Sequence, residues 1–375
     1  MLIELYIFAI IIVVYGTFTT LAIIGFGKLN EISEEETTVA PFISIVISAR
    51  NEADNIEVCL QQIIKQKFAS QNFEIILIDD ASEDATYDIA VNVLKNSIIS
   101  HQLIKQHSHK GKKQNISEAI KIAKGSIIIT SDADVVYRNS YWLLTISNYF
   151  KNYSPNMLIM PIDFENHSGF LANFQIIENL ALTAITAGYC GIKKPFMCNG
   201  ANLAFKKSAY NLVSGYDSHL HISSGEDIFL MEEIKKADPN SIHYGLIRSL
   251  IVKTKTLHTI KSLFQQRIRW AYKAKYNSNN LNLFASFIIL ATNLLFVALI
   301  LAIIKESVII PYLSIFVFAK FVFDFLLLFL ASNFLGRTKI IWWLIPFGFI
   351  YWIYAIIVGI CSLFVKPYWK GKKIN

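Results

Sequence analysis

The stretch Phe42-Ile-Ser-Ile-Val-Ile-Ser-Ala-Arg-Asn-Glu52 decides the fold of this chain. Its first seven residues are apolar or small and largely β-branched, a pattern typical of a short strand that is buried on both faces. Apolar residues at helical spacing follow over residues 53–67. The same succession recurs, with further strands expected at 73–78 and 126–130 and further helices at 85–94 and 116–123. Strands that alternate with helices predict an α/β domain on a mostly parallel sheet with helices on both faces.

Acidic residues follow three of the predicted strands. Arg50-Asn-Glu52 comes after the first, Asp79-Asp-Ala-Ser-Glu-Asp84 after the second, and Asp132-Ala-Asp134 after the strand at 126–130. Helix capping explains acids in any one such loop. Because ligands of parallel sheets bind beyond the carboxyl ends of the strands, three acidic loops at one edge favour a binding site.

The pair Asp132 and Asp134 points to a metal ion. Residues two apart in an extended chain project to the same side, so the two carboxylates repel each other unless a cation lies between them. Mg²⁺ is held in proteins by one or two carboxylates and takes its other ligands from water and phosphate oxygens. The spacing therefore predicts a site for a divalent cation bound to a diphosphate.

Four long apolar stretches predict membrane helices. The first, residues 5–27, lies between Glu4 and Lys28, which predicts an uncleaved anchor whose start is outside and whose end is cytoplasmic. Three more runs cover 282–304, 307–335 and 340–365. Three full spans would leave the basic tail outside, against the positive-inside rule. We therefore expect one run to lie in the membrane plane or to be re-entrant, either the run that contains Pro346 or the one after Leu281.

Composition agrees with a globular domain joined to membrane spans. Of 375 residues, 54% are hydrophobic and 17% are charged, which excludes a disordered chain. The net charge of +7 comes without a basic tract interleaved with aromatic residues, so we expect membrane lipids and no nucleic acid as a partner. The four cysteines form no C-x-x-C pair, which argues against a zinc site or a disulfide framework.

Residues 257–275 predict an amphipathic helix with a single apolar stripe. Gln266, Arg269 and Trp270 fall on the opposite side. The stripe is flanked by four basic residues: Lys261, Arg267, Lys273 and Lys275. This pattern is typical of a helix on an anionic membrane surface, with its polar side toward the soluble domain. An ordinary surface helix packed on that domain is the alternative.

Six motifs, in order over about residues 42–275, resemble those of membrane-bound family 2 glycosyltransferases with the GT-A fold. They are Ser48-Ala-Arg-Asn-Glu52, Asp79-Asp-Ala-Ser-Glu-Asp84, Gly111-Lys112, Asp132-Ala-Asp134, Gly225-Glu-Asp227 and Gln266-Arg-Ile-Arg-Trp270. Ala81 departs from the family pattern, because glycine is common there. The resemblance implies a Rossmann-like, mostly parallel cytoplasmic domain with one N-terminal and about three C-terminal transmembrane helices.

The resemblance also implies a reaction and the residues that carry it. An inverting enzyme would move a sugar from a nucleotide-sugar, with a UDP-sugar expected, to a hydroxyl of a lipid-linked or glycan acceptor. Asp227 would be the catalytic base, with Glu226 beside it. The donor would be bound by Arg50, Glu52, Asp80, Lys112 and Asp132. Mg²⁺ or Mn²⁺ would be held by Asp134, helped by Asp132, and the acceptor and diphosphate would meet Gln266, Arg269 and Trp270.

Taken together, the patterns predict a multi-pass protein of the cell (inner) membrane with a cytoplasmic catalytic domain. The expected parts are an anchor at 1–28, a GT-A domain at 29–255, an interface helix at 256–280 and a transmembrane region with a basic tail at 281–375. A catalytically inactive, nucleotide-sugar-binding membrane regulator is the alternative. A transporter is disfavoured, because the chain has too few spans for inverted repeats.

Overall fold

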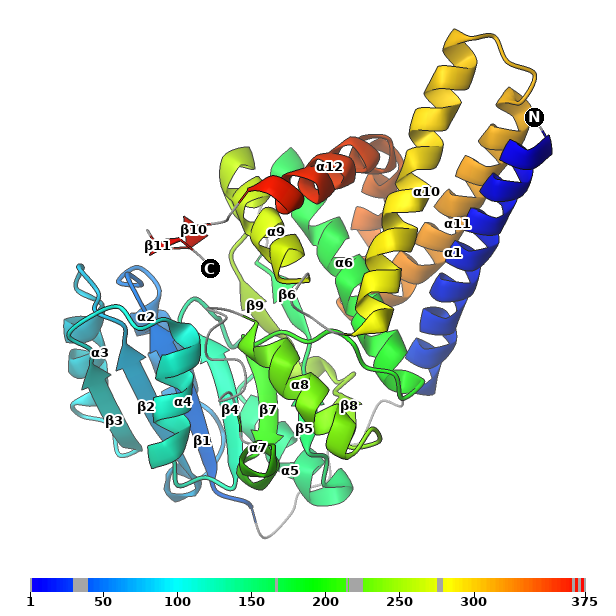
Figure 1. Ribbon diagram of the computed structural model, residues 1–375. Coiled ribbons are helices and arrows are strands. Elements are labelled where there is room, and N and C mark those ends of the chain that lie inside the picture. Colours follow the sequence, from blue (N-terminus) through cyan, green and yellow to red (C-terminus); the bar gives the residue numbers. More distant parts are fainter. Residues whose placement is uncertain are drawn as a thin grey trace. The chain divides into compact units, whose positions relative to one another are not determined.

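The computed structural model describes residues 2–29, 40–165, 168–213, 215, 225–274, 279–365, 368–369 and 372–373. The chain forms two compact units (Figure 1). The sheet unit comprises Asn30–Asn166 and Lys193–Lys255. The helical unit comprises Met1–Leu29, His167–Ile192 and Thr256–Ile374.

A mixed, mostly parallel sheet forms the centre of the sheet unit. Its strand order is β3 (Ser100–Lys105), β2 (Phe73–Asp79), β1 (Ile43–Ala49), β4 (Ile127–Asp132), β7 (Asn202–Lys206), β5 (Met157–Ile159), β8 (Ile242–Tyr244). The first four strands are parallel, and β7 runs antiparallel to both β4 and β5. The predicted α/β class is therefore confirmed, although β3 and the three strands beyond β4 were not expected.

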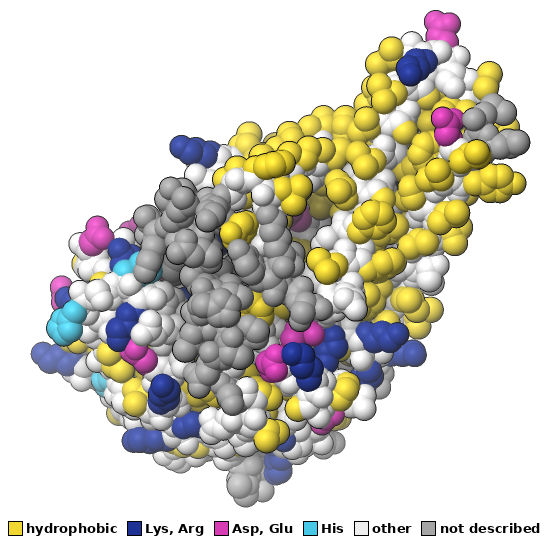
Figure 2. All heavy atoms as spheres, in the orientation of Figure 1, with side chains coloured by type: hydrophobic (Ala, Val, Ile, Leu, Met, Phe, Trp, Pro, Cys, Tyr) yellow, Lys and Arg dark blue, Asp and Glu magenta, His cyan; other side chains and the backbone are white. Residues whose placement is uncertain are grey.

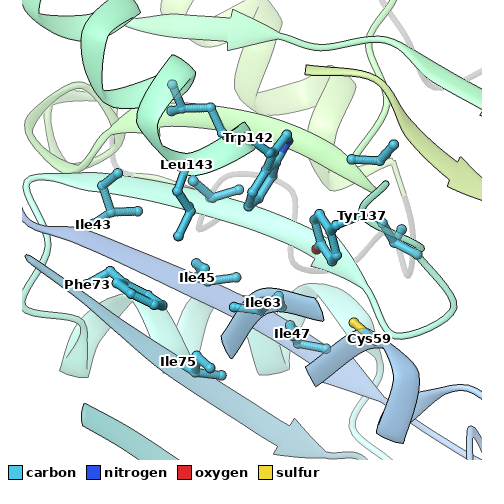
Figure 3. Close-up of a cluster of buried hydrophobic side chains, with 14 of the residues drawn as sticks. Ile43, Ile45, Ile47, Cys59, Ile63, Phe73, Ile75, Tyr137, Trp142 and Leu143 are labelled. Carbon is cyan, nitrogen blue, oxygen red and sulfur yellow. The ribbon is translucent and has the colours of Figure 1, made fainter. Parts of the chain in front are cut away.

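Helices cover both faces of this sheet. Figure 3 shows the apolar cluster on one face, where Ile43, Ile45 and Ile47 of β1 pack with side chains of α2 (Ile56–Ile64) and α5 (Trp142–Tyr153). Residues of β1 alternate, so Ser48 faces the other side, where its hydroxyl accepts a hydrogen bond from Asn115 of α4 (Lys112–Ile122) at 3.2 Å. Burial on both faces explains why these strands read as continuous apolar runs.

The rest of the sheet unit consists of short elements around this core. They are η1 (Ser70–Asn72), α3 (Thr86–Leu94), α7 (Lys207–Leu212), α8 (Glu226–Ala237), η3 (Arg248–Leu250) and a two-stranded parallel sheet of β6 (Ile162–Phe164) with β9 (Val252–Thr254). The small sheet matters for the site, because β9 carries a residue that contacts the end of β4.

The helical unit contains α1 (Leu2–Lys28), α6 (Phe170–Gly191), α9 (Ile260–Ala274), α10 (Asn280–Ile304), α11 (Ile310–Phe334), η4 (Thr338–Trp343) and α12 (Leu344–Phe364), followed by a short pairing of β10 (Tyr368–Trp369) with β11 (Lys372–Lys373). Within the described residues, five helical segments are long and apolar enough to cross a membrane: α1, α6, α10, α11 and Thr338–Phe364. Four of them were expected from the sequence, and α6 was not.

Both flanks of helix α6 belong to the sheet unit. The segment before it pairs in the sheet unit, where Glu165 N donates to Thr254 O at 2.9 Å. The segment after it enters β7, which lies between β4 and β5 of the main sheet. Both ends of α6 are therefore joined to the same compact unit. The structure assigns α6 itself to the helical unit, and the predicted domain boundaries 29 and 255 stay a prediction.

Helix α12 differs in direction from the other apolar helices. Helices α1, α10 and α11 contact one another and run side by side, whereas α12 runs across them (Figure 1). Apolar side chains cover the outer surface along this bundle, and charged side chains on the visible face gather at its end (Figure 2).

A charged pair inside the bundle is satisfied by its neighbours. Lys320 Nζ lies 2.6 Å from Asp324 Oδ2 on the next turn of α11. The hydroxyl of Tyr15 on α1 donates a hydrogen bond to the other oxygen of Asp324. Unpaired charge is costly at membrane depth. These contacts join α1 to α11.

Helices α1 and α6 approach each other so closely that only glycine fits at the crossing. A Cβ built on Gly188 would lie 2.2 Å from the carbonyl oxygen of Ala22, and one on Gly25 would lie 1.8 Å from that of Gly188. Such small residues let helix backbones pack directly in membranes.

We expect Gly188→Ala to destabilise the protein by about 1–3 kcal/mol, because the added methyl group forces α1 and α6 apart. The measurement is thermal unfolding in detergent. Gly27→Ala is the matched control, since a Cβ at that position of α1 has nothing within 4 Å. Equal melting temperatures for the two variants would contradict the close crossing.

Candidate active site

The carboxyl ends of three parallel strands meet at one edge of the sheet. In the strand register, Ala49 of β1 lies opposite Asp79 of β2, and Ser48 lies opposite Asp132 of β4. The three acidic loops predicted from the sequence are therefore adjacent. Parallel pairing alone produces this convergence, because every strand ends at the same edge.

Arg50 ties the first loop to the second. Its Nη1 donates to the carbonyl oxygens of Asp80 and Ala81 at 2.9 and 3.2 Å, and its Nη2 lies 3.1 Å from Glu83 Oε1. Ala81 has a φ of +55°, where a glycine would be unstrained. Arg50 thus holds Ala81 in a backbone conformation that alanine adopts only with strain.

Asp80 lies at the base of the second loop and is 1% exposed. Its carboxylate accepts hydrogen bonds from the backbone N–H groups of Lys110 and Gly111 at 2.8 and 3.1 Å, and His109 Nδ1 lies 2.5 Å from Oδ2. Gly111 has a φ of +98°, which favours glycine at this turn. Asp80 therefore fixes the start of α4, which carries Lys112.

Lys112 lies between acidic groups from two different elements. Its Nζ is 2.5 Å from Asp132 Oδ1 on β4 and 3.6 Å from Glu226 Oε1 at the start of α8. Although burial alone lowers it, the neighbouring Asp132 and Glu226 hold the pKa of Lys112 above its usual value. The ammonium group remains charged and joins the D-x-D motif to the Glu226-Asp227 pair.

Asp134 is buried close to two other carboxylates of the site, Asp132 and Glu52. Burial, reinforced by the charges of Asp132 and Glu52, raises the pKa of Asp134 to about 6. The hydroxyl of Thr254 on β9 donates a hydrogen bond to Asp134 Oδ2 at 2.9 Å. A carboxylate held beside two others and kept from water is in the state that a divalent cation stabilises.

Glu226 and Asp227 begin helix α8, directly after Gly225 with a φ of +93°. Asp227 Oδ1 accepts a hydrogen bond from Ile228 N at 2.9 Å. A Cβ built on Gly200 would lie 3.6 Å from Asp227 Oδ2 and 3.4 Å from Lys112 Nζ, so both groups border the same glycine. Asp227 therefore lies in the same cluster of charged side chains as Lys112 and Asp132.

The predicted donor, metal and base residues all belong to the sheet unit: Arg50, Glu52, Asp80, Lys112, Asp132, Asp134, Glu226 and Asp227. Within it, Lys112 contacts Asp132 and Glu226, Asp134 lies near Asp132 and Glu52, and Arg50 contacts the backbone of Asp80 and Ala81. Gln266, Arg269 and Trp270 lie on α9 of the helical unit. Two contributors were missed. His109 precedes the Gly111 turn and could have been noticed there, whereas no local signal marks Thr254, which lies 120 positions from Asp134.

The oxygen ligands available at the strand end meet part of what a hard divalent cation such as Mg²⁺ requires. Among the residues that the structure describes, no group of three or more His, Cys, Asp or Glu side chains is placed to hold a metal ion. Asp132 and Asp134 supply carboxylate oxygens at one strand end. Two carboxylates with the remaining ligands from a diphosphate and water are a usual arrangement for Mg²⁺.

Known proteins share this domain. Residues 44–213 match the model of the glycosyl transferase family 2. A poly-β-1,6-N-acetyl-D-glucosamine synthase of Staphylococcus epidermidis is 24% identical over 250 residues, which are 66% of this chain and 57% of the synthase. A second relative is the β-1,3-glucosyltransferase WfaP of Escherichia coli, whose name specifies UDP-Glc and α-D-GlcNAc-diphosphoundecaprenol. It is 39% identical over 107 residues, which are 28% of this chain and 39% of WfaP. The chain thus spans little more than half of the first of these relatives.

The fold is also shared. A mannosyltransferase from Pyrobaculum calidifontis, solved in complex with GDP-Man and Mn²⁺, aligns with this chain at a TM-score of 0.56 and 14% sequence identity. The alignment covers 95% of this chain and 99% of the mannosyltransferase chain. That similarity supports the GT-A fold, and the family match supports the predicted class of protein. The family match covers residues 44–213, which include almost all of β1, the whole of β2 and β4, and the acidic loops that follow these strands.

Proposed function

We propose that this protein is a membrane-bound inverting glycosyltransferase, which moves a sugar from a nucleotide-sugar to a hydroxyl group of a lipid-linked or glycan acceptor. The observation that carries the proposal is the convergence of Asp132, Glu226 and Asp227 around Lys112 in a segment that matches the family 2 model. The names of its relatives support a sugar donor carried on UDP, with GDP as the competing carrier.

The donor is held by the loops at the strand ends. Glu52 and Asp80 line the nucleoside end, and Arg50 acts on the donor through the loop that it fixes. Lys112 faces the diphosphate, where its charge opposes the negative charge that develops on the leaving group. Its present partners, Asp132 and Glu226, keep the ammonium in place before the donor arrives.

A divalent cation, Mg²⁺ or Mn²⁺, completes the diphosphate site in this proposal, held by Asp134 and Asp132. When bound, the cation supplies Lewis-acid stabilisation of the leaving diphosphate. Thr254 orients the Asp134 carboxylate through its hydrogen bond. Such second partners of metal ligands affect metal affinity strongly.

Asp227 takes the proton of the acceptor hydroxyl as its oxygen attacks the anomeric carbon in line with the leaving group. One displacement inverts that carbon. The helix N-terminus favours the ionised form of Asp227, which is the form that can accept a proton. Gln266, Arg269 and Trp270 contact the acceptor and the diphosphate in this proposal.

We expect Thr254→Val to weaken Mn²⁺ binding about 10- to 100-fold, because the valine keeps the shape of threonine but cannot donate to Asp134. Electron paramagnetic resonance of free Mn²⁺ measures the affinity without any turnover. Thr254→Ser retains the hydroxyl and is the matched control. Unchanged Mn²⁺ affinity in the valine variant would remove Thr254 from the metal site.

The proposed topology places the sheet unit in the cytoplasm of a cell whose inner membrane holds α1, α10 and α11 as spans. Helices α6 and α12 then lie along the cytoplasmic interface, α6 because both of its flanks are on one side. This arrangement also returns the basic tail to the inside, as the positive-inside rule requires.

Cysteine labelling tests this topology. On a background without the four native cysteines, Ser100→Cys and Lys373→Cys should both resist a membrane-impermeant maleimide in intact cells and react after lysis. Glu306→Cys, between α10 and α11, should react from outside and is the positive control. Labelling at 100 from outside would invert the topology, and labelling at 373 alone would make α12 a span.

The function itself is tested with purified full-length protein in detergent. The protein is incubated with UDP-GlcNAc, UDP-Glc or GDP-mannose, a divalent cation and a lipid extract, and products are identified by mass spectrometry. Donor-dependent appearance of a glycosylated lipid or glycan supports the proposal. Tight nucleotide binding without transfer for any of these donors would instead favour the nucleotide-sugar-binding regulator.

A further inference from the structure

Arg267 on α9 is buried, although the sequence pattern placed it beside an apolar stripe at a membrane surface. Its side chain is 6% exposed, and its partner Glu178 on α6 is 11% exposed. Arg267 Nε and Nη2 lie 2.8 and 2.6 Å from Glu178 Oε2. A buried charge of either sign requires such a partner. The pair therefore fixes α9 against α6 within the helical unit.

Tyr354 brings a third helix to this contact. Its hydroxyl donates to Glu178 Oε1 at 3.2 Å, so each oxygen of the carboxylate has a partner. The ring packs edge-on against Phe174 of α6 and Phe264 of α9, with centroid distances of 5.0 and 5.2 Å. Glu178, Arg267 and Tyr354 thus form a junction of α6, α9 and α12, which we call the three-helix junction.

The same guanidinium also contacts two residues of the Q-x-x-R-W motif. Arg267 Nη1 donates a hydrogen bond to Gln266 Oε1. Its guanidinium carbon lies 4.1 Å from the centroid of the Trp270 ring, a distance typical of a cation–π contact. Trp270 is 40% exposed, so this contact restrains a ring that solvent otherwise leaves mobile. One side chain thereby links the junction to Gln266 and Trp270.

We infer that Glu178 and Arg267 are positioning residues, which hold Gln266 and Trp270 in the orientation that transfer requires. Neither is assigned a contact with substrate. The kinetic consequence rests on the proposed function, whereas the orientation of Trp270 rests on the contacts of the helical unit alone. A pair that only stabilised the fold would be replaceable by any other well-packed pair.

Three variants separate positioning from stability. Arg267→Met leaves Glu178 buried without its charge partner and should lower both the melting temperature and turnover. The double variant Glu178→Met with Arg267→Met replaces the pair by apolar side chains and should recover the melting temperature, because such replacements are often neutral. Turnover of the double variant should stay about 10- to 100-fold below wild type, with unchanged affinity for the nucleoside diphosphate. Lys261→Met, exposed on the same helix, is the matched control and should keep wild-type turnover.

A second measurement does not depend on turnover. Acrylamide quenching of Trp270 fluorescence, obtained as the difference between each variant and the same variant with Trp270→Phe, reports whether the ring is held. We expect stronger quenching in the double variant than in wild type. Recovery of turnover together with stability, or unchanged Trp270 quenching, would overturn the inference. Absence of transfer by the wild-type chain would defeat the proposed function instead, and the quenching result would still decide the inference.

Discussion

Asp227→Asn is expected to lower the turnover number by about 10²–10⁴-fold while the affinity for the nucleotide-sugar donor stays close to wild type. Asn keeps the size of Asp and can still accept the hydrogen bond from Ile228 N, but it cannot take a proton. An interaction that is made only in the transition state changes kcat rather than ground-state binding. Single-turnover rates and donor binding on the same purified variant measure the two quantities.

Two other roles for Asp227 predict different results. Asp and Asn serve about equally well at a helix start, so a purely capping Asp227 would leave rate and stability unchanged. A structural ion-pair role would lower the melting temperature. Asp238→Asn, at the other end of α8, is the matched control and should keep the wild-type rate. A normal rate with Asn at position 227 would transfer the role of base to Glu226.

Asp134→Asn is expected to abolish transfer and, unusually, to stabilise the fold at neutral pH. Transfer is lost because the amide cannot replace the carboxylate as a ligand of the cation that faces the diphosphate. The Asn side chain can still accept the hydrogen bond from Thr254. Removal of one negative charge also relieves its repulsion with Asp132 and Glu52, the neighbours that help to raise its pKa.

The sign of the stability effect follows from the raised pKa of Asp134, which is about 6 against an ordinary value of 3.8. The native state binds the proton more tightly than the unfolded state, so this group lowers the stability as pH rises from about 4 to 6, and the penalty persists above that range. Above pH 7 without metal, the Asn variant should therefore be more stable than wild type by on the order of 2 kcal/mol. The advantage should disappear below pH 4.

Thermal unfolding across pH, with and without Mn²⁺, tests this pair of effects. Mn²⁺ should raise the melting temperature of wild type and leave that of Asp134→Asn unchanged. Asp88→Asn, at an exposed position on α3, is the matched control. Wild-type protein that transfers sugar fully in the presence of a chelator would refute the metal dependence.

The elements that the sequence predicted well are those with strong local patterns. β1 and β2 are nearly continuous apolar runs because both faces are covered, and α10, α11 and α12 lie within long apolar stretches. β3 was missed, since Ser100-His-Gln-Leu-Ile-Lys105 is an edge strand whose side chains are only partly buried and show no clean alternation. β7 was missed because its antiparallel place between β4 and β5 depends on distant partners.

Helix α6 shows where local patterns fail. Gln175 and Glu178 lie inside it, so its composition reads as that of a soluble domain rather than a membrane helix. In the structure, Gln175 Nε2 donates to the carbonyl oxygen of Leu257, and Glu178 pairs with Arg267. Both polar side chains are therefore satisfied by α9 and the segment before it. The local pattern predicted Arg267 at a membrane surface because its partner Glu178 lies 89 positions away and leaves no local signal.

The sequence by itself determined the class of sheet, the order of its acidic loops, the four long apolar segments and the residue types of the candidate site. Each depends on a pattern a few residues long, which hydrophobic burial or turn chemistry dictates locally. Tertiary structure alone decided that Thr254 supports Asp134, that Lys112 joins Asp132 to Glu226, and that both flanks of α6 belong to the sheet unit. These features depend on contacts between residues far apart in the chain, whose distances are set only when the whole sheet and the helices around it have packed.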